Sequence, residues 1–222
     1  MRLWLRENSG FVLFLLLFGV FRTAVADWNP IPSGSMHPGL LEGDVVFVNR
    51  LAYNVKIPLT DLVLAHTGEP RRGDIVTFSS PADGRRLIKR IVAVPGGTVQ
   101  MQARRLTING QSAQYRFDGR VDETDTAGRP WVGLTVQEAF DSRRHEIEWA
   151  QDRRNAADFG PITIPADHYL MLGDNRDNSA DSRFFGLVSR EQLIGRAERI
   201  LVSAATLDHW QPRLSRFWAA LQ

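Results

Sequence analysis

The chain has 222 residues, 43% of them hydrophobic, which is enough for one globular domain with a substantial core. It has 27 lysines and arginines against 25 aspartates and glutamates and no continuous basic run, which argues against a nucleic-acid-binding protein. It has no cysteine, which excludes disulfides, thiolate catalysis and cysteine-ligated zinc. The five histidines lie far apart in the sequence, so we expect neither a metal site nor a cofactor.

The first predicted element is a membrane segment. Residues 11–21 are almost entirely apolar and follow two arginines, so we expect residues 1–8 on the cytoplasmic side. A helix that crosses a bilayer needs about 20 residues. Residues 9–28 supply that length if the Arg22 side chain extends to the far interface. Residues 24–26, Ala-Val-Ala, also fit a cleavable signal peptide, but the position of Arg22 favours a retained single-pass anchor.

Residues 29–222 are expected to form an extracytoplasmic, mainly β domain. Runs rich in β-branched and aromatic residues predict strands over residues 44–48, 74–78, 87–94, 98–108, 162–164, 169–172 and 199–203. Asn109-Gly110 predicts a hairpin turn that returns the chain along residues 112–117. Residues 109–160 are rich in charged residues and are a candidate inserted region, in which residues 135–150 favour a short helix.

The tail, residues 209–222, mixes apolar and basic side chains. It contains Trp210, Phe217 and Trp218 together with Arg213 and Arg216. This composition fits a segment that lies on a membrane surface. It fits equally well a terminal amphipathic helix that packs on the core, and the sequence leaves both arrangements open.

A turn rich in proline and glycine carries the first candidate catalytic residue. Residues 31–40 read Ile-Pro-Ser-Gly-Ser-Met-His-Pro-Gly-Leu, which predicts a tight, exposed turn. Ser33 and Ser35 are two residues apart, so one hydroxyl can attack a carbonyl while the other donates a hydrogen bond nearby. The turn lacks the Gly-x-Ser-x-Gly pattern of the serine hydrolases, and taken alone it is an ordinary loop.

A serine nucleophile needs a base, and Lys89 is the better of two candidates. It is one of only two lysines in the chain, and in a strand it shares a face with Leu87 and Ile91. Burial among apolar side chains would lower its pKa and supply a neutral amine. His37 lies two residues from Ser35, but side chains that close in an extended turn usually point apart. The alternative for Lys89 is a non-catalytic lysine that reaches solvent at a strand edge.

Residues 173–186 form a polar segment directly after an apolar strand. It does not match a calcium loop, because serine and phenylalanine stand where that loop needs glycine and glutamate. We interpret it as a hydrogen-bonded loop that supports a site. Ion pairs of Asp181 with Arg183 and of Asp177 with Arg176 would stiffen it.

Together these segments resemble the bacterial type I signal peptidases, membrane-bound Ser/Lys endopeptidases that remove signal peptides. The matching motifs are Pro-Ser-Gly-Ser-Met-x-Pro at 32–38, Gly-Asp-x-Val at 43–46, Lys-Arg-Ile at 89–91 and Gly-Asp-Asn-x-x-x-Ser-x-Asp-Ser-Arg at 173–183. Their order and spacing agree over residues 31–186. The resemblance implies an antiparallel β catalytic domain with an inserted smaller region. It also implies signal-peptide-bearing precursors as substrates and a place in the inner membrane, with the catalytic domain on the periplasmic face.

The resemblance further implies a role for each matched residue. Ser35 would be the nucleophile and Lys89 the general base. The Ser33 hydroxyl and the Ser35 backbone N–H would form the oxyanion hole, and Ser179 would hydrogen-bond the Lys89 amine. Structural support would come from Asp181 and Arg183. Shallow pockets for small substrate side chains would be lined by Ile31, Pro32, Met36, Leu40 and Ile88.

Two other functions remain open on the sequence alone. One is a conjugation-type or repressor-type Ser/Lys peptidase with a single dedicated substrate, which a panel of unrelated precursors would distinguish. The other is a non-catalytic, membrane-anchored envelope protein that binds exported chains. Such a protein would keep its function when Ser35 or Lys89 is replaced by alanine.

Overall fold

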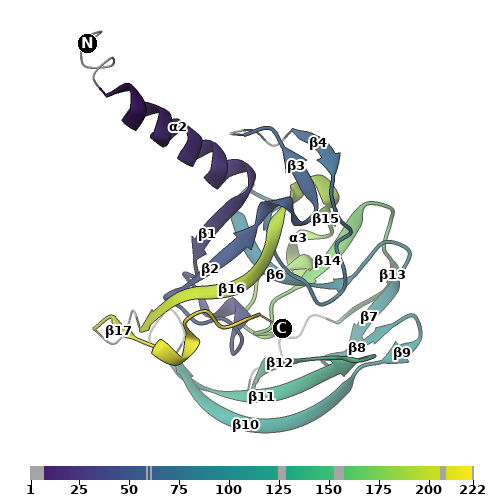
Figure 1. Cartoon of the computed structure of the whole chain (residues 1–222). Helices are drawn as coiled ribbons and strands as arrows, with labels where there is room; N and C mark the ends of the chain where they lie inside the picture. The colour runs from purple at the N-terminus through teal and green to yellow at the C-terminus, as the bar shows by residue number, and fades with distance from the viewer. Residues whose placement is uncertain are drawn as a thin grey trace.

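The computed structural model describes residues 8–58, 60, 62–124, 129–152, 158–205 and 209–221. About half of this part of the chain is strand, arranged in one eight-stranded sheet and three smaller sheets (Figure 1). The pairings are antiparallel throughout these sheets. The predicted mainly β, antiparallel fold is therefore confirmed.

The eight-stranded sheet carries the candidate catalytic lysine. Its order is β1-β2-β16-β5-β6-β14-β15, with β17 paired to β16. The strands are β1 (Ala26–Pro30), β2 (Asp44–Asn49), β5 (Ile75–Ser79), β6 (Arg86–Ala93), β14 (His168–Leu172), β15 (Val188–Ser189), β16 (Leu193–Ala205) and β17 (Gln211–Pro212). Lys89 lies opposite Val76 of β5, on a strand with neighbours on both sides. Its strand is therefore not an edge strand, and Lys89 itself is buried.

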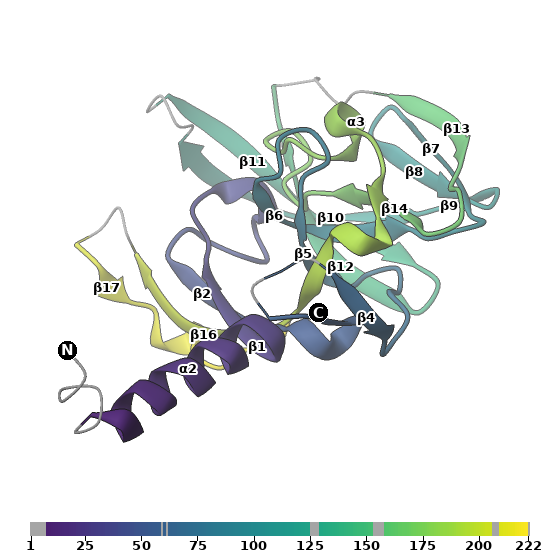
Figure 2. The same cartoon turned by 90° about the horizontal axis from the view of Figure 1, so that it is seen from above.

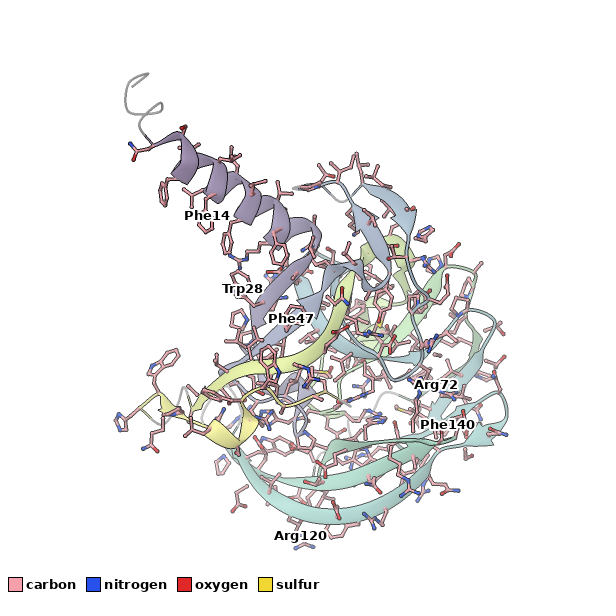
Figure 3. All side chains as sticks on the ribbon, in the orientation of Figure 1. Phe14, Trp28, Phe47, Arg72, Arg120 and Phe140 are labelled. Atoms are coloured by element: carbon pink, nitrogen blue, oxygen red, sulfur yellow. The ribbon has the colours of Figure 1, made fainter. Side chains whose placement is uncertain are left out.

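A curved three-stranded ribbon runs along one side of the molecule (Figures 1 and 2). It consists of β10 (Gln114–Thr124), β11 (Pro130–Phe140) and β12 (Arg143–Ala150). The prediction of a short helix within residues 135–150 is wrong, because β11 and β12 pair continuously from Gly133 with Ala150 to Phe140 with Arg143. Arg72 lies over the Phe140 ring, 4.1 Å from its centroid, and so connects the ribbon to the turn before β5 (Figure 3).

Two further sheets complete the fold. One contains β13 (Phe159–Thr163), β7 (Thr98–Gln102), β8 (Arg105–Ile108) and β9 (Gln111–Ser112), and the other contains β3 (Asn54–Lys56) and β4 (Val63–His66). The predicted turn at Asn109-Gly110 is confirmed, since both residues have positive φ, 51° and 78°. The returning strand β9 pairs with β8 over only two residues, so the return along β8 is shorter than predicted. From Gln114 the chain continues as β10 of the ribbon.

Three clusters of buried apolar side chains hold these sheets together. The cluster beneath the candidate nucleophile turn contains Ile31, Met36, Leu40, Val46, Val48, Ile75, Ala197 and Ile200. A second cluster, beside Lys89 in the central sheet, contains Tyr53, Val76, Phe78, Ile91, Tyr169, Met171, Val188 and Leu193. The third joins β6 and β14 to the four-stranded sheet and contains Val92, Ala93, Val99, Met101, Leu106, Ile108, Ala113, Ile164, Leu170 and Leu172. Each large side chain buried in this way stabilises the fold by about 1.5–3 kcal/mol.

The N-terminal helix α2 (Ser9–Ala24) projects away from the sheets and exposes its apolar side chains, Phe14 among them (Figure 3). The predicted membrane helix over residues 9–28 is wrong in extent. The chain turns into β1 at Ala26 because Asp27 is buried there, with Arg86 at 2.8 Å and Arg22 at 3.3 Å. Within the described ranges, no helix is both long and apolar enough to cross a membrane.

The C-terminal tail follows neither predicted arrangement completely. It contains β17 and one short 3-10 helix, η4 (Leu214–Arg216), so the predicted terminal helix is wrong. Ala219 and Leu221 pack against the cluster beneath the nucleophile turn, while Trp210 and Trp218 are exposed. The remaining short helices are η1 (Gly34–Met36), η2 (Arg50–Ala52), η3 (Arg190–Gln192) and α3 (Ser182–Phe185).

Candidate active site

The candidate nucleophile lies on a turn that is fixed at both ends by the core. Ser35 is the middle residue of η1, which follows β1. Met36 and Leu40 are completely buried beneath it, and the Leu40 N–H donates to the Met36 carbonyl. The chain is also held to β2, because the Ile31 N–H donates to the Asp44 carbonyl. Ser35 itself stays half-buried, so its hydroxyl is held in place and remains accessible.

Lys89 approaches this hydroxyl from the central sheet. Its amine nitrogen is 2.6 Å from the Ser35 Oγ, although 54 residues separate the two in sequence. Only 3% of Lys89 is exposed, and burial lowers its pKa to about 8, with a further lowering from Arg183. Asp181 and Asp174 raise the pKa but do not outweigh burial. About a tenth of the amine is therefore neutral at pH 7 and about half at pH 8, and the neutral form is the one that a general base requires.

The polar loop after β14 surrounds the lysine with paired charges. Arg90, the neighbour of Lys89, makes two hydrogen bonds to the Asp174 carboxylate, at 2.8 and 2.7 Å. Arg183 does the same to Asp181, at 2.7 and 2.7 Å, which confirms the predicted pair. The second Asp181 oxygen also accepts a hydrogen bond from the Gly173 N–H, at 3.0 Å. These buried pairs hold the loop against β6.

Gly173 lets this loop approach the nucleophile closely. A Cβ added at Gly173 would lie 2.2 Å from the Ser179 Oγ and 2.5 Å from the Ser35 carbonyl oxygen, too close for any side chain. The Asn175 N–H donates to the same Ser35 carbonyl, at 3.2 Å. Glycine is therefore needed at position 173 for space, and the loop and the turn form one unit.

The two remaining matched serines differ in how they are placed. Ser33 is exposed and extended, and its hydroxyl donates to the Ser35 Oγ at 3.5 Å, which keeps it beside the reacting oxygen. Ser179 is buried, but its hydroxyl makes no hydrogen bond to any residue that the structure describes. The predicted hydrogen bond from Ser179 to Lys89 is thus not formed in this structure.

Comparisons with known proteins show the family of the chain. The family model described as "Signal peptidase, peptidase S26" matches residues 4–202. The chain belongs to this family. A "Signal peptidase I" from Pseudomonas fluorescens is 36% identical over 217 residues, which are 92% of this chain and 72% of the relative. Another from Pseudomonas aeruginosa is 35% identical over 204 residues, 86% of this chain and 69% of the relative.

Among solved structures, a signal peptidase I from Enterococcus faecalis is 29% identical. The match covers 58% of this chain and 96% of that chain, with a TM-score of 0.37, which is too low to carry an argument about the fold.

The residues expected to line substrate pockets separate into two groups in this S26 peptidase. Ile31, Met36 and Leu40 are core side chains with almost no exposed surface. Pro32 is exposed and Ile88 is half-buried, and they lie close in sequence to Ser35 and Lys89 respectively. A role in substrate binding stays a prediction for all five residues.

Sequence reasoning missed the neighbours of the nucleophile on its other side. The His37 ring does not face the Ser35 hydroxyl: its Nε2 is 2.6 Å from Glu42 and its Nδ1 is 3.1 Å from Glu123. His37 is therefore occupied by carboxylates and is excluded as the base. Glu42 lies close by in sequence, but no sequence signal connects His37 with Glu123, which comes from β10. The Arg90–Asp174 pair was missed for the same reason.

Proposed function

We propose that this chain is a serine endopeptidase that removes signal peptides from exported precursor proteins, with Ser35 as nucleophile and Lys89 as general base. The observation that carries the assignment is the 2.6 Å separation of the Lys89 amine and the Ser35 hydroxyl, with the lysine buried. Membership of the signal peptidase family and relatives named "Signal peptidase I" support the substrate class.

The reaction is an acyl transfer in two stages. Neutral Lys89 takes the Ser35 proton while Oγ attacks the scissile carbonyl, which gives a tetrahedral oxyanion. The ammonium then gives its proton to the leaving amine, the peptide bond breaks, and an ester joins the signal peptide to Ser35. Lys89 next deprotonates a water molecule that attacks this ester. Collapse of the second intermediate returns the proton to Oγ and frees the signal peptide.

We assign the oxyanion hole to the Ser33 hydroxyl and the Ser35 backbone N–H. The exposed position of Ser33, with its oxygen 3.5 Å from the Ser35 Oγ, supports this role. Donors that are held in place before the charge develops stabilise the transition state by about 3–4 kcal/mol each.

We assign supporting roles to Ser179, Asp181 and Arg183. Asp181 and Arg183 hold the loop that carries Ser179, and their two hydrogen bonds support this role. The Ser179 hydroxyl is buried next to Gly173 and has no hydrogen-bond partner among the described residues, which leaves it free to orient the Lys89 amine.

We also infer that the chain is attached to the inner membrane in a single pass. Residues 1–8 would then be cytoplasmic, α2 (Ser9–Ala24) would lie in lipid, and the chain from β1 onward would form the catalytic domain on the periplasmic face, with residues 109–160 as an insertion. The support is the exposed apolar surface of α2: Phe11, Leu13, Phe14, Leu15, Leu16, Leu17, Phe18, Val20 and Phe21. Arg22 lies over the Trp28 ring, 4.4 Å from its centroid, a pair suited to an interface between lipid and water.

The test is cleavage of a model precursor with an Ala-x-Ala site by the detergent-purified full-length protein, followed by sequencing of the new N-terminus. We expect cleavage after the second alanine, and loss of it in Ser35→Ala and Lys89→Ala. Cleavage of one precursor alone from a panel would indicate a dedicated peptidase. Binding of precursors without cleavage by the folded wild type would indicate the non-catalytic alternative.

A further inference from the structure

A second polar cluster lies next to the nucleophile turn and does not include Lys89. It brings together His37 from the turn, Glu123 from β10 and Glu148 from β12. One ligand-type atom from each, a ring nitrogen and two carboxylate oxygens, lie within 4.8 Å of one another. Residues separated by 86 and 25 positions in the sequence thus meet at one point, where the ribbon passes the turn (Figures 1 and 2).

The charges in this cluster do not balance. Glu148 is 1% exposed and accepts a hydrogen bond from Asn175, and the cation paired with Glu123 is the His37 imidazole. A single imidazole therefore faces these two carboxylates and that of Glu42. Buried carboxylates are normally paired with cations or bound to metal ions. The cluster is short of positive charge.

The groups around the cluster resemble the outer shell of a metal site. The Nε2 of His37 is bonded to the Glu42 carboxylate at 2.6 Å, which leaves Nδ1 facing Glu123. Histidines that bind metal through one ring nitrogen usually donate the other N–H to a carboxylate in this way. The completely buried Asn175 turns its Nδ2 onto Glu148 at 3.1 Å, while its Oδ1 has no hydrogen-bond partner among the described residues.

Two glycines keep space open for these side chains. A Cβ on Gly34 would lie 2.9 Å from Glu42 and 3.1 Å from the His37 ring, and a Cβ on Gly133 would lie 2.9 Å from the Glu148 carboxyl carbon. Neither glycine has a positive φ, so the backbone conformation does not require glycine at either position. The close approach of the cluster explains glycine at position 34, while glycine at position 133 makes room for Glu148 and also for Val121, whose Cγ1 would lie 2.8 Å from a Cβ.

We propose that His37 Nδ1, Glu123 and Glu148 bind one divalent transition-metal ion of the Zn²⁺ type. A ligand set of one imidazole nitrogen and two carboxylate oxygens suits Zn²⁺, which takes about four ligands, so a water molecule would complete it. Mg²⁺ and Ca²⁺ prefer ligand sets made only of oxygen and would bind more weakly. The expectation that widely spaced histidines exclude a metal site considered histidines alone, whereas here two ligands are glutamates.

The site would connect the ribbon to the catalytic turn. His37 lies two residues after Ser35, and Asn175 bridges the two regions, because its backbone N–H donates to the Ser35 carbonyl while its side chain contacts Glu148. A bound ion would therefore hold the turn in place from behind without contact with the substrate.

The test is Zn²⁺ binding to the chelator-treated, full-length protein in detergent, measured by competition with a chromophoric chelator. Co²⁺ absorption provides a second readout that reports the ligand geometry. We expect one ion per chain, and a loss of affinity of more than about 10-fold in His37→Ala, Glu123→Gln and Glu148→Gln. Glu42→Gln should weaken binding about 10–100-fold through the outer shell. Glu146→Gln, exposed on the same strand β12, and His209→Ala, also exposed, are matched controls and should bind as the wild type does.

Circular dichroism checks that each variant is folded. If a buried variant is not folded, the decision rests on Glu42→Gln and Glu123→Gln, whose positions are partly exposed. The proposal is wrong if the wild type binds no Zn²⁺ saturably, or if the folded cluster variants bind as tightly as the controls. It is also wrong if Ca²⁺ competes as well as Zn²⁺, since the nitrogen ligand would then contribute nothing.

Discussion

The two polar clusters that border the Ser35 turn each hold a buried basic group, and the pKa values of these two groups are shifted in opposite directions. On one side, burial lowers the pKa of Lys89 to about 8. Its direct contact is a neutral hydroxyl, and Asp181, the carboxylate that raises its pKa most, is itself paired with Arg183. Nearby negative charge therefore stabilises the protonated amine too little to offset the loss of hydration that burial causes.

On the other side, burial also lowers the pKa of His37, but its hydrogen bonds to Glu123 and Glu42 outweigh burial and raise the pKa to about 10. Burial raises the pKa of Glu148 to about 7, with a further contribution from Glu123. In both clusters the charge of the direct partner decides the outcome. Lys89, whose direct partner is a neutral hydroxyl, can lose its proton and act as a base. His37, whose direct partners are carboxylates, keeps its proton or binds a metal cation in its place.

The substitution expected to have the largest effect is Lys89→Arg, which tests the role of the neutral amine. Arginine keeps its proton when buried, so it cannot act as the base even where it fits. We expect kcat for precursor cleavage to fall by about 10²–10⁴-fold. The matched control is Lys56→Arg, at the only other lysine, which lies in β3 and whose amine donates to the Glu191 carbonyl in η3. This variant should keep near wild-type kcat. If Lys89→Arg retains a tenth or more of wild-type kcat, proton abstraction by Lys89 is not required.

The sequence predicted the catalytic side of the turn better than the other side. The burial of Lys89 was predicted because it shares a strand face with apolar residues of β6. Its contact with Ser35 was predicted from the matched motifs. The Asp181–Arg183 ion pair was predicted because the two residues are close in sequence. The same reasoning gave Asp177 with Arg176, which is wrong: Asp177 pairs with Arg104.

Long-range contacts explain what the sequence did not reveal. Arg176 pairs with Glu138 of the ribbon at 2.6 Å, and His37 meets Glu123 from the same ribbon. The ribbon itself was not predicted, because its charged residues face partners in the folded protein and hide the alternation typical of strands. The end of α2 at Ala24 depends in the same way on Asp27, which is buried against Arg86 from β6.

A smaller effect is expected for Ser33→Ala. This substitution tests whether the residues around Ser35 stabilise the oxyanion in addition to transferring the proton. We expect kcat to fall by about 10²–10³-fold while KM changes little, because the hydroxyl would act on the oxyanion of the transition state. Steady-state kinetics on a peptide substrate measures both constants. Ser112→Ala, at an exposed serine on β9, is the control. A rise in KM alone would remove Ser33 from the oxyanion hole and make it a binding residue.

The most gradual effect is the pH dependence of cleavage, and it measures directly how burial acts on the catalytic side. Only the neutral amine can accept the Ser35 proton, and below the pKa its fraction falls about tenfold per pH unit. With the Lys89 pKa near 8, kcat/KM should rise through pH 6 and 7 and level off above about 8. Thermal unfolding at each pH separates this effect from instability caused by titration of Glu148. A constant rate between pH 5 and 7 would exclude Lys89 as the base. A midpoint near the ordinary lysine value of 10.5 would mean that the amine is hydrated in solution, so that burial does not set its pKa and the contrast with His37 disappears.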